Sequence, residues 1–82
     1  MIILDANTME DRDALHAAIK TQLGLPDYYG GNLDALNDCL GERRERELIV
    51  IRRFSDFAEN LGPYGLKLLQ VFSDNGWQVL LD

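Results

Sequence analysis

This 82-residue chain contains, at residues 25–40, the stretch Leu25-Pro26-Asp27-Tyr28-Tyr29-Gly30-Gly31-Asn32-Leu33-Asp34-Ala35-Leu36-Asn37-Asp38-Cys39-Leu40. Its first half is rich in turn-forming residues, and its second half is amphipathic. Asn32 is a favoured N-cap because its side chain can accept a hydrogen bond from the first turn of a helix. Leu33, Leu36 and Leu40 follow at helical spacing. We therefore predict a helix that begins after Asn32, buries this leucine stripe and closes at Gly41.

Strand and helix patterns alternate on either side of this stretch. Three short apolar runs are typical of strands that pack into a core: residues 2–4, 48–51 and 77–81. Thr8 with an acid three residues later resembles a capping box and predicts that the first helix begins there. Further helical patterns cover 54–61 and the segment from Gly62-Pro63 to Asn75-Gly76. The order β-α-α-β-α-β predicts an α/β fold, with a small three-stranded parallel sheet packed with helices, as a single domain over 1–82.

The charge distribution constrains the partners. The chain has a net charge of −6, from 14 acidic and eight basic residues. Residues 42–53 hold five arginines and three glutamates, a local +2, so the remainder carries −8. Such a surface repels nucleic acid over most of its area. It attracts a basic partner and accelerates association with it.

The location is expected to be the cytoplasm. A single cysteine, Cys39, cannot form an internal disulfide, which favours a reducing compartment. The apolar run at residues 2–4 is too short for a signal peptide. No stretch approaches the 18 or more apolar residues of a membrane span. We expect a soluble protein that is a monomer when free and does not bind membranes.

Asp34 and Asp38 lie four residues apart and should share one face of the predicted helix, roughly 5–6 Å apart at Cβ. Like charges at this spacing destabilise a helix by about 0.2–0.5 kcal/mol. No lysine or arginine lies within a turn to neutralise them. A solvated helix face is one interpretation of the pair. The other is an acidic binding surface beside Tyr28 and Tyr29.

The whole of residues 25–40 closely resembles the signature of the barstar family, the intracellular inhibitors of barnase-like bacterial ribonucleases. Leu69-Gln70-Val71-Phe72 and the order of elements extend the resemblance over essentially the whole chain. It implies a barstar-like fold and a 1:1 complex with a basic secreted ribonuclease or toxin domain. The residues expected to bind this partner are Tyr28, Tyr29, Gly30, Asn32, Asp34, Asn37, Asp38, Gly41, Arg43 and Asp74.

The resemblance also implies roles. Tyr28 would cover the guanine-reading side of the nuclease site, and Asp34 and Asp38 would meet its arginine, lysine and histidine side chains. Carboxylates held on a helix would thus imitate the phosphate that the nuclease stabilises. The chain departs from the family pattern where Asn37 replaces an interface tryptophan and where arginines from Arg43 onward replace another aromatic contact. These departures predict that its nuclease differs from barnase.

Three other functions remain open at this point. The chain could be an immunity protein against a toxin of different chemistry, such as a deoxyribonuclease, or a regulatory interaction module without a toxin partner. An enzyme that uses Asp34 and Asp38 as an acid–base pair is disfavoured, because an exposed helix face cannot separate their pKa values. His16 lacks neighbours at metal-ligand spacing, and we expect no metal and no cofactor.

Overall fold

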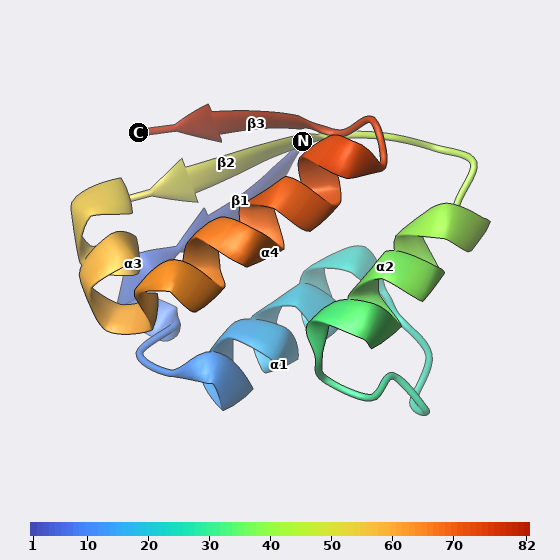
Figure 1. Cartoon of the computed structure of the whole chain (residues 1–82), viewed down its shortest axis with the longest axis horizontal. Helices are drawn as coiled ribbons and strands as arrows, with labels where there is room; N and C mark the ends of the chain where they lie inside the picture. Colours follow the sequence, from blue (N-terminus) through green and yellow to red (C-terminus); the bar gives the residue numbers. More distant parts are fainter.

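A computed structural model describes residues 1–82 and shows a parallel sheet with helices (Figure 1). The elements in chain order are β1 (Ile2–Asp5), the short 3-10 helix η1 (Ala6–Thr8), α1 (Arg12–Leu23), α2 (Leu33–Glu42), β2 (Leu48–Arg52), α3 (Phe54–Leu61), α4 (Pro63–Asp74) and β3 (Gln78–Leu81). The three strands are parallel and ordered β1-β2-β3. The predicted fold class and element order are confirmed. No helix combines the length and apolar character needed to span a membrane.

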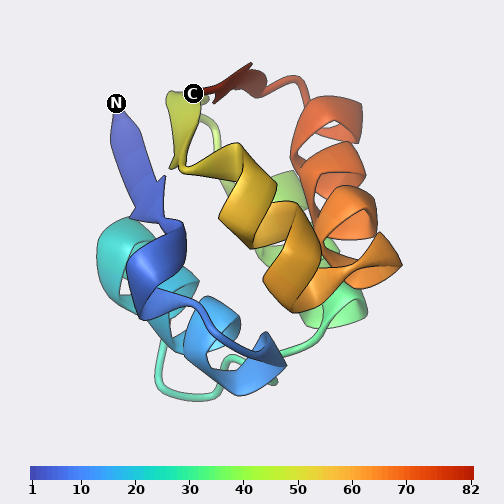
Figure 2. The same ribbon diagram turned by 90° about the vertical axis from the view of Figure 1, so that its left-hand side faces the viewer.

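The helices gather on one side of the sheet, as Figures 1 and 2 both show. Successive side chains of a strand point to opposite faces, so Ile49 and Ile51 of the central strand are completely buried under the helices. Val50 points to the other face, where it is flanked in register by Ile3 and Leu80. These neighbours reduce its exposure to 9% although no helix covers it. This explains why β2 is apolar at every position from 48 to 51.

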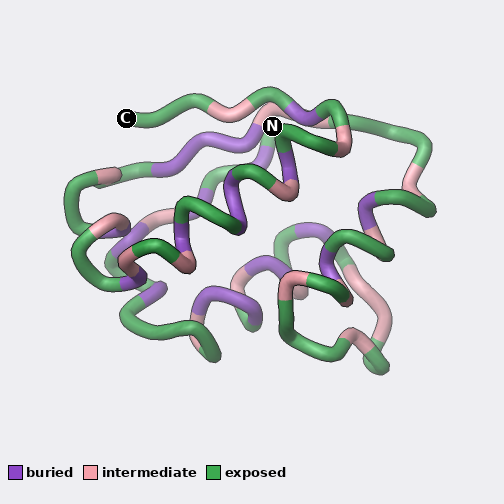
Figure 3. The backbone as a smooth tube through the Cα atoms, viewed as in Figure 1, coloured by how far each residue is buried: buried purple, intermediate pink, exposed green.

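The core lies between the sheet and the helices (Figure 3). A single cluster of 17 buried residues includes side chains from the sheet and from the helices, among them Leu4 of β1, Leu36 of α2 and Phe72 of α4. Trp77 belongs to this cluster just before β3 begins, with its ring edge-on to Phe72 at a centroid distance of 5.3 Å. The packing leaves the opposite face of α2 to solvent.

The first helix begins later than the Thr8 capping box predicts, and that prediction is wrong. Thr8 closes η1, and its hydroxyl donates to the backbone carbonyl of Asp5. The N-cap of α1 is Asp11, whose carboxylate accepts from the Ala14 backbone N–H at 2.8 Å. Met9 between them is fully buried. Because the Met9 side chain packs into the core, the backbone at this point does not continue as a helix, and α1 starts only after Asp11.

Glycines at 41 and 65 give a matched test of the helix packing. A Cβ on Gly65 of α4 would lie 2.8 Å from Cε1 of Phe57 and 3.0 Å from Cβ of Leu61, whereas one on Gly41 of α2 would meet nothing within 4 Å. Gly65→Ala should therefore destabilise the fold by about 1–3 kcal/mol through overpacking. Gly41→Ala should stabilise it by up to about 1 kcal/mol through helix propensity. Urea unfolding measures both, and equal effects would contradict this packing of α3 on α4.

Candidate partner-binding site

The loop between α1 and α2 is fastened to the body of the protein by a buried histidine. His16 of α1 is only 4% exposed. Its Nδ1 lies 2.5 Å from the hydroxyl of Tyr29 in the loop, and its Nε2 lies 2.6 Å from the hydroxyl of Tyr64 in α4. A neutral imidazole has one donor and one acceptor nitrogen, so one hydroxyl donates to the ring and the other accepts from it. The loop, α1 and α4 thus meet at this ring.

Burial determines the protonation states of His16, Tyr29 and Tyr64. Burial lowers the pKa of His16, and the negative charge of Asp13 acts in the opposite direction with a smaller effect. Burial also raises the pKa of Tyr29, and it raises the pKa of Tyr64 against the opposing influence of Arg12. All three groups are therefore held neutral near pH 7. His16, Tyr29 and Tyr64 therefore join the loop to the two helices through hydrogen bonds alone, and no buried charge is left that would need an oppositely charged partner.

The two loop tyrosines have different environments, which the sequence pattern left undecided. Tyr29 is half-buried and packs against the core cluster. Tyr28 is 84% exposed, the largest exposure among the big apolar and aromatic side chains. A ring displayed in this way is available to a partner. Gly30 beside it is also exposed, and Gly31 adopts φ +66°, a conformation that favours glycine and turns the chain into α2.

Helix α2 presents Asp34 and Asp38 to solvent, as expected. Asn32 caps the helix as predicted, with its Oδ1 accepting from the Ala35 backbone N–H at 2.8 Å. Leu36 and Leu40 are buried, so the aspartates lie away from the core. Neither aspartate forms an ion pair or hydrogen bond within the chain. Both charges are free to meet a partner.

Glu42 belongs to the same surface and was missed by the sequence analysis. The helix does not close at Gly41 but continues through Glu42, which is four residues beyond Asp38. A groove of about 320 Å³ runs along this part of the molecule and is lined by Tyr28, Tyr29, Gly30, Ala35, Asp38, Cys39 and Glu42. Cys39 is half-buried in it, and its thiol pKa is raised by burial first and then by the nearby Glu42 and Asp38 charges. Helical spacing from Asp38 could have identified Glu42.

Asp74 and Asn37 lie at the contact between α2 and α4. Asp74 is exposed, and its carboxylate accepts a hydrogen bond from Gln70 at 2.8 Å. The adjacent Asn75 donates through its side-chain amide to Oδ1 of Asn37, 2.9 Å away, and to the carbonyl of Val71. Asn37 therefore ties the two helices together from the exposed face of α2. The hydrogen bond joins the exposed face of α2 to the end of α4, next to Asp74.

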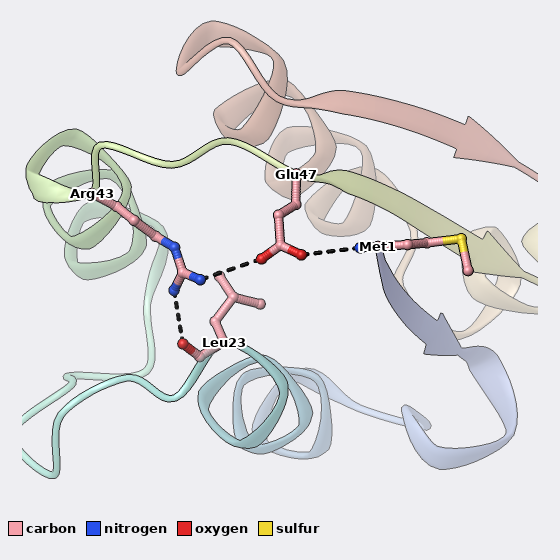
Figure 4. A network of polar contacts seen from close by, with 4 residues as sticks. All are labelled: Met1, Leu23, Arg43 and Glu47. Carbon is pink, nitrogen blue, oxygen red and sulfur yellow. Dashed lines mark hydrogen bonds and ion pairs between the residues drawn. The ribbon is translucent and has the colours of Figure 1, made fainter.

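Arg43 is directed into the chain rather than outward (Figure 4). Its guanidinium donates to the carbonyl of Leu23 at the end of α1 and to Glu47, at 2.8 and 3.3 Å. Glu47 also pairs with the amino group of Met1 at 3.0 Å. The guanidinium carbon lies 5.6 Å from the centroid of the Trp77 ring. Arg43 thus holds the segment between α2 and β2 in place, and a contact with a partner stays a prediction.

The arrangement is suited to binding. The acidic face consists of the exposed side chains of Asp34, Asp38 and Glu42, the last two of which line the groove. No group of three or more His, Cys, Asp or Glu side chains has a geometry that could hold a metal ion. Fixed carboxylates beside an exposed aromatic ring can form charge-assisted hydrogen bonds with cationic side chains. Fold and site together define a class: a small α/β protein with an exposed acidic helix face that is suited to binding a basic macromolecule.

Comparison with known proteins identifies the family to which this chain belongs. The family model described as Barstar (barnase inhibitor) matches residues 1–79. The chain belongs to the barstar family, as its resemblance over residues 25–40 indicated. A curated protein of Bacillus subtilis (strain 168), named "Putative ribonuclease inhibitor YrdF", is 38% identical over 74 residues, which are 89% of this chain and 81% of that protein. Barstar proteins are inhibitors, which confirms the expectation that the chain is not an enzyme.

The buried histidine predicts a pH dependence of stability. His16 is the only histidine, and its pKa is lowered in the folded state. The unfolded chain therefore binds a proton more readily, near pH 6.5. The contribution of His16 to stability should be constant above about pH 7.5 and fall as the pH drops through about 6.5 towards the lowered folded pKa.

Urea unfolding of the native chain and of His16→Gln at about pH 7.5 and 5.5 measures this effect, in a range where most carboxylates stay ionised. The variant should be less stable at the upper pH, because two buried hydroxyls lose a partner, but should show a smaller decrease between the two values. The same decrease in both proteins would contradict the assignment to His16.

Proposed function

We propose that this protein inhibits a barnase-like secreted ribonuclease inside the cell, by placing the acidic face of α2 and the preceding loop in the nuclease active site. A ribonuclease stabilises the charge that develops on phosphate with clustered cationic side chains. Asp34 and Asp38 would occupy the position of that phosphate, and the exposed ring of Tyr28 would cover the adjacent base-reading surface. Membership of the barstar family and the name of the Bacillus subtilis relative support this function.

The observation that carries the proposal is the absence of any internal partner for the acids of α2. Asp34 lies in the first turn, where the helix dipole favours an anion, but Asp38 lies beyond it. Neither is neutralised by a basic side chain within the chain. Arg12 lines a hollow with Asp34, yet its guanidinium carbon stacks 4.1 Å from the Tyr64 ring centroid and forms no ion pair.

The fixed loop favours the same function. An inhibitor that orders its binding residues before the encounter loses less conformational entropy on association. Here the loop is held by the hydrogen bond between His16 and Tyr29, and α2 is held to the end of α4 by the hydrogen bond between Asn75 and Asn37. The acids therefore project from a surface that is already arranged. This arrangement supports tight 1:1 binding to a complementary cationic site.

The direct test is an RNA cleavage assay with barnase and further small secreted ribonucleases, each with and without the purified protein. We expect stoichiometric inhibition of at least one of them and no cleavage by the protein alone. A protein that leaves all of these ribonucleases active but blocks a deoxyribonuclease toxin would instead be an immunity protein on the same scaffold. That result would refute the ribonuclease proposal.

Asp38→Ala should weaken the complex by more than about 2 kcal/mol, the range of interface hot spots. The expected change in the free energy of unfolding is within about 0.5 kcal/mol, because the side chain is exposed and makes no internal contact. Calorimetric titration and urea unfolding measure the two quantities. Glu59→Ala on α3, an exposed acid outside the site, is the matched control and should change neither. A comparable loss of stability and affinity in Asp38→Ala would count against the proposal.

The association rate constant should depend steeply on salt. With a net charge of −6, the chain should be steered towards a basic nuclease, and this attraction is screened as the Debye length shortens. We expect the rate constant to fall about tenfold or more between ~0.03 and ~0.5 M salt. The dissociation rate should change much less, because the paired charges are then desolvated. Stopped-flow mixing measures both rates, and a salt-independent association rate would exclude electrostatic steering.

A further inference from the structure

The groove beside the C-terminal half of α2 has a composition suited to one kind of side chain. Its volume is about 320 Å³. The lining has an apolar part, from Ala35 and Cys39, and an aromatic part, from Tyr28 and Tyr29. Asp38 and Glu42 supply its only formal charges, and both are negative. A long side chain with an apolar stem and a cationic head matches each of these parts.

No stabilising contact within the fold explains why position 42 is a glutamate. The side chain is exposed and forms neither a hydrogen bond nor an ion pair within the chain. It is the last residue of α2, where the helix dipole disfavours an anion. It also lies four residues from Asp38, so the two like charges repel each other. Both effects destabilise the free protein and would be reversed by a bound cation.

We propose that this groove binds one arginine or lysine side chain of the partner between Asp38 and Glu42, and that Glu42 is a specificity-determining residue. The inference deepens the proposed function and rests on it for the identity of the partner. The stem of the side chain lies over Ala35 and Cys39. The cationic head reaches both carboxylates, and the face of the Tyr28 ring adds a cation–π contact. An arginine is favoured over a lysine, because its planar guanidinium can serve two carboxylates at once.

A small probe tests the groove without a nuclease. Acetyl-arginine-amide carries the proposed side chain, and acetyl-citrulline-amide has nearly the same shape without the charge. In ¹H–¹⁵N NMR titrations of the whole chain, the arginine probe should bind weakly, in the millimolar range. It should shift the amide signals of Tyr28, Cys39 and Glu42 together. The citrulline probe should not shift them.

Two variants complete the test. Glu42→Gln should weaken binding of the arginine probe by about fivefold, the upper range for an exposed ion pair. Glu59→Gln removes an equal charge on α3 and should leave binding unchanged. Shifts scattered over all acidic surfaces, equal binding by both variants, or no binding of arginine would each overturn the inference.

The outcomes separate this inference from the proposed function. If the arginine probe fails to bind but the protein still blocks a ribonuclease, the inhibitor function stands and the groove assignment fails. If the probe binds in the groove but no ribonuclease is inhibited, the groove assignment stands and the inhibitor function fails. With an inhibited ribonuclease, Glu42→Gln should also weaken the complex by at least fivefold, whereas Glu59→Gln should not.

Discussion

The arrangement of the acidic face depends on the buried imidazole of His16. A polar ring in the interior must have hydrogen-bond partners, and here they are the hydroxyls of Tyr29 and Tyr64. Those two tyrosines come from the loop and from α4, so one ring fixes the loop between two helices. A Cβ on Gly31 would lie 3.8 Å from Cβ of His16, so the backbone also passes close to this point. The start of α2, and with it the position of every acid on the helix, follows from this contact.

Two groups of acids in the chain can be compared, and the comparison supports the proposed binding surface more directly than the net charge does. One group performs structural work as helix caps or in ion pairs: Asp5, Asp11, Asp27, Glu47 and Asp82. The acids of α2 (Asp34, Asp38 and Glu42) neither cap a helix nor form an ion pair within the chain. From Asp34 through Asp38 to Glu42 they also move from the favourable to the unfavourable end of the helix dipole. This internal cost supports the proposal that the acids of α2 meet the cations of a partner.

Local signals in the sequence predicted most of the fold, whereas contacts between distant segments could not be predicted. The Asn32 cap, the leucine stripe and the apolar β2 depend on neighbouring residues, and all three were predicted correctly. The error at Thr8 arose because burial of Met9 overrode a local capping pattern. The link between His16 and Tyr64 spans 48 residues, and no spacing rule reveals it. The hydrogen bond between His16 and Tyr29 likewise joins α1 to the loop, so the sequence could not decide which loop tyrosine is buried.

The exposed face of α2 is more polar than the family pattern alone implies. Where barstar carries an interface tryptophan, Asn37 accepts a hydrogen bond from Asn75 and joins α2 to α4. Arg43, in a region where the family has another aromatic contact, is directed inward to Leu23 and Glu47. Both substitutions convert apolar contact area into internal hydrogen bonds that hold the helix. If this surface binds the nuclease as proposed, most of its binding energy should come from charge pairs, and the arrangement of cations on each partner should determine which one it binds.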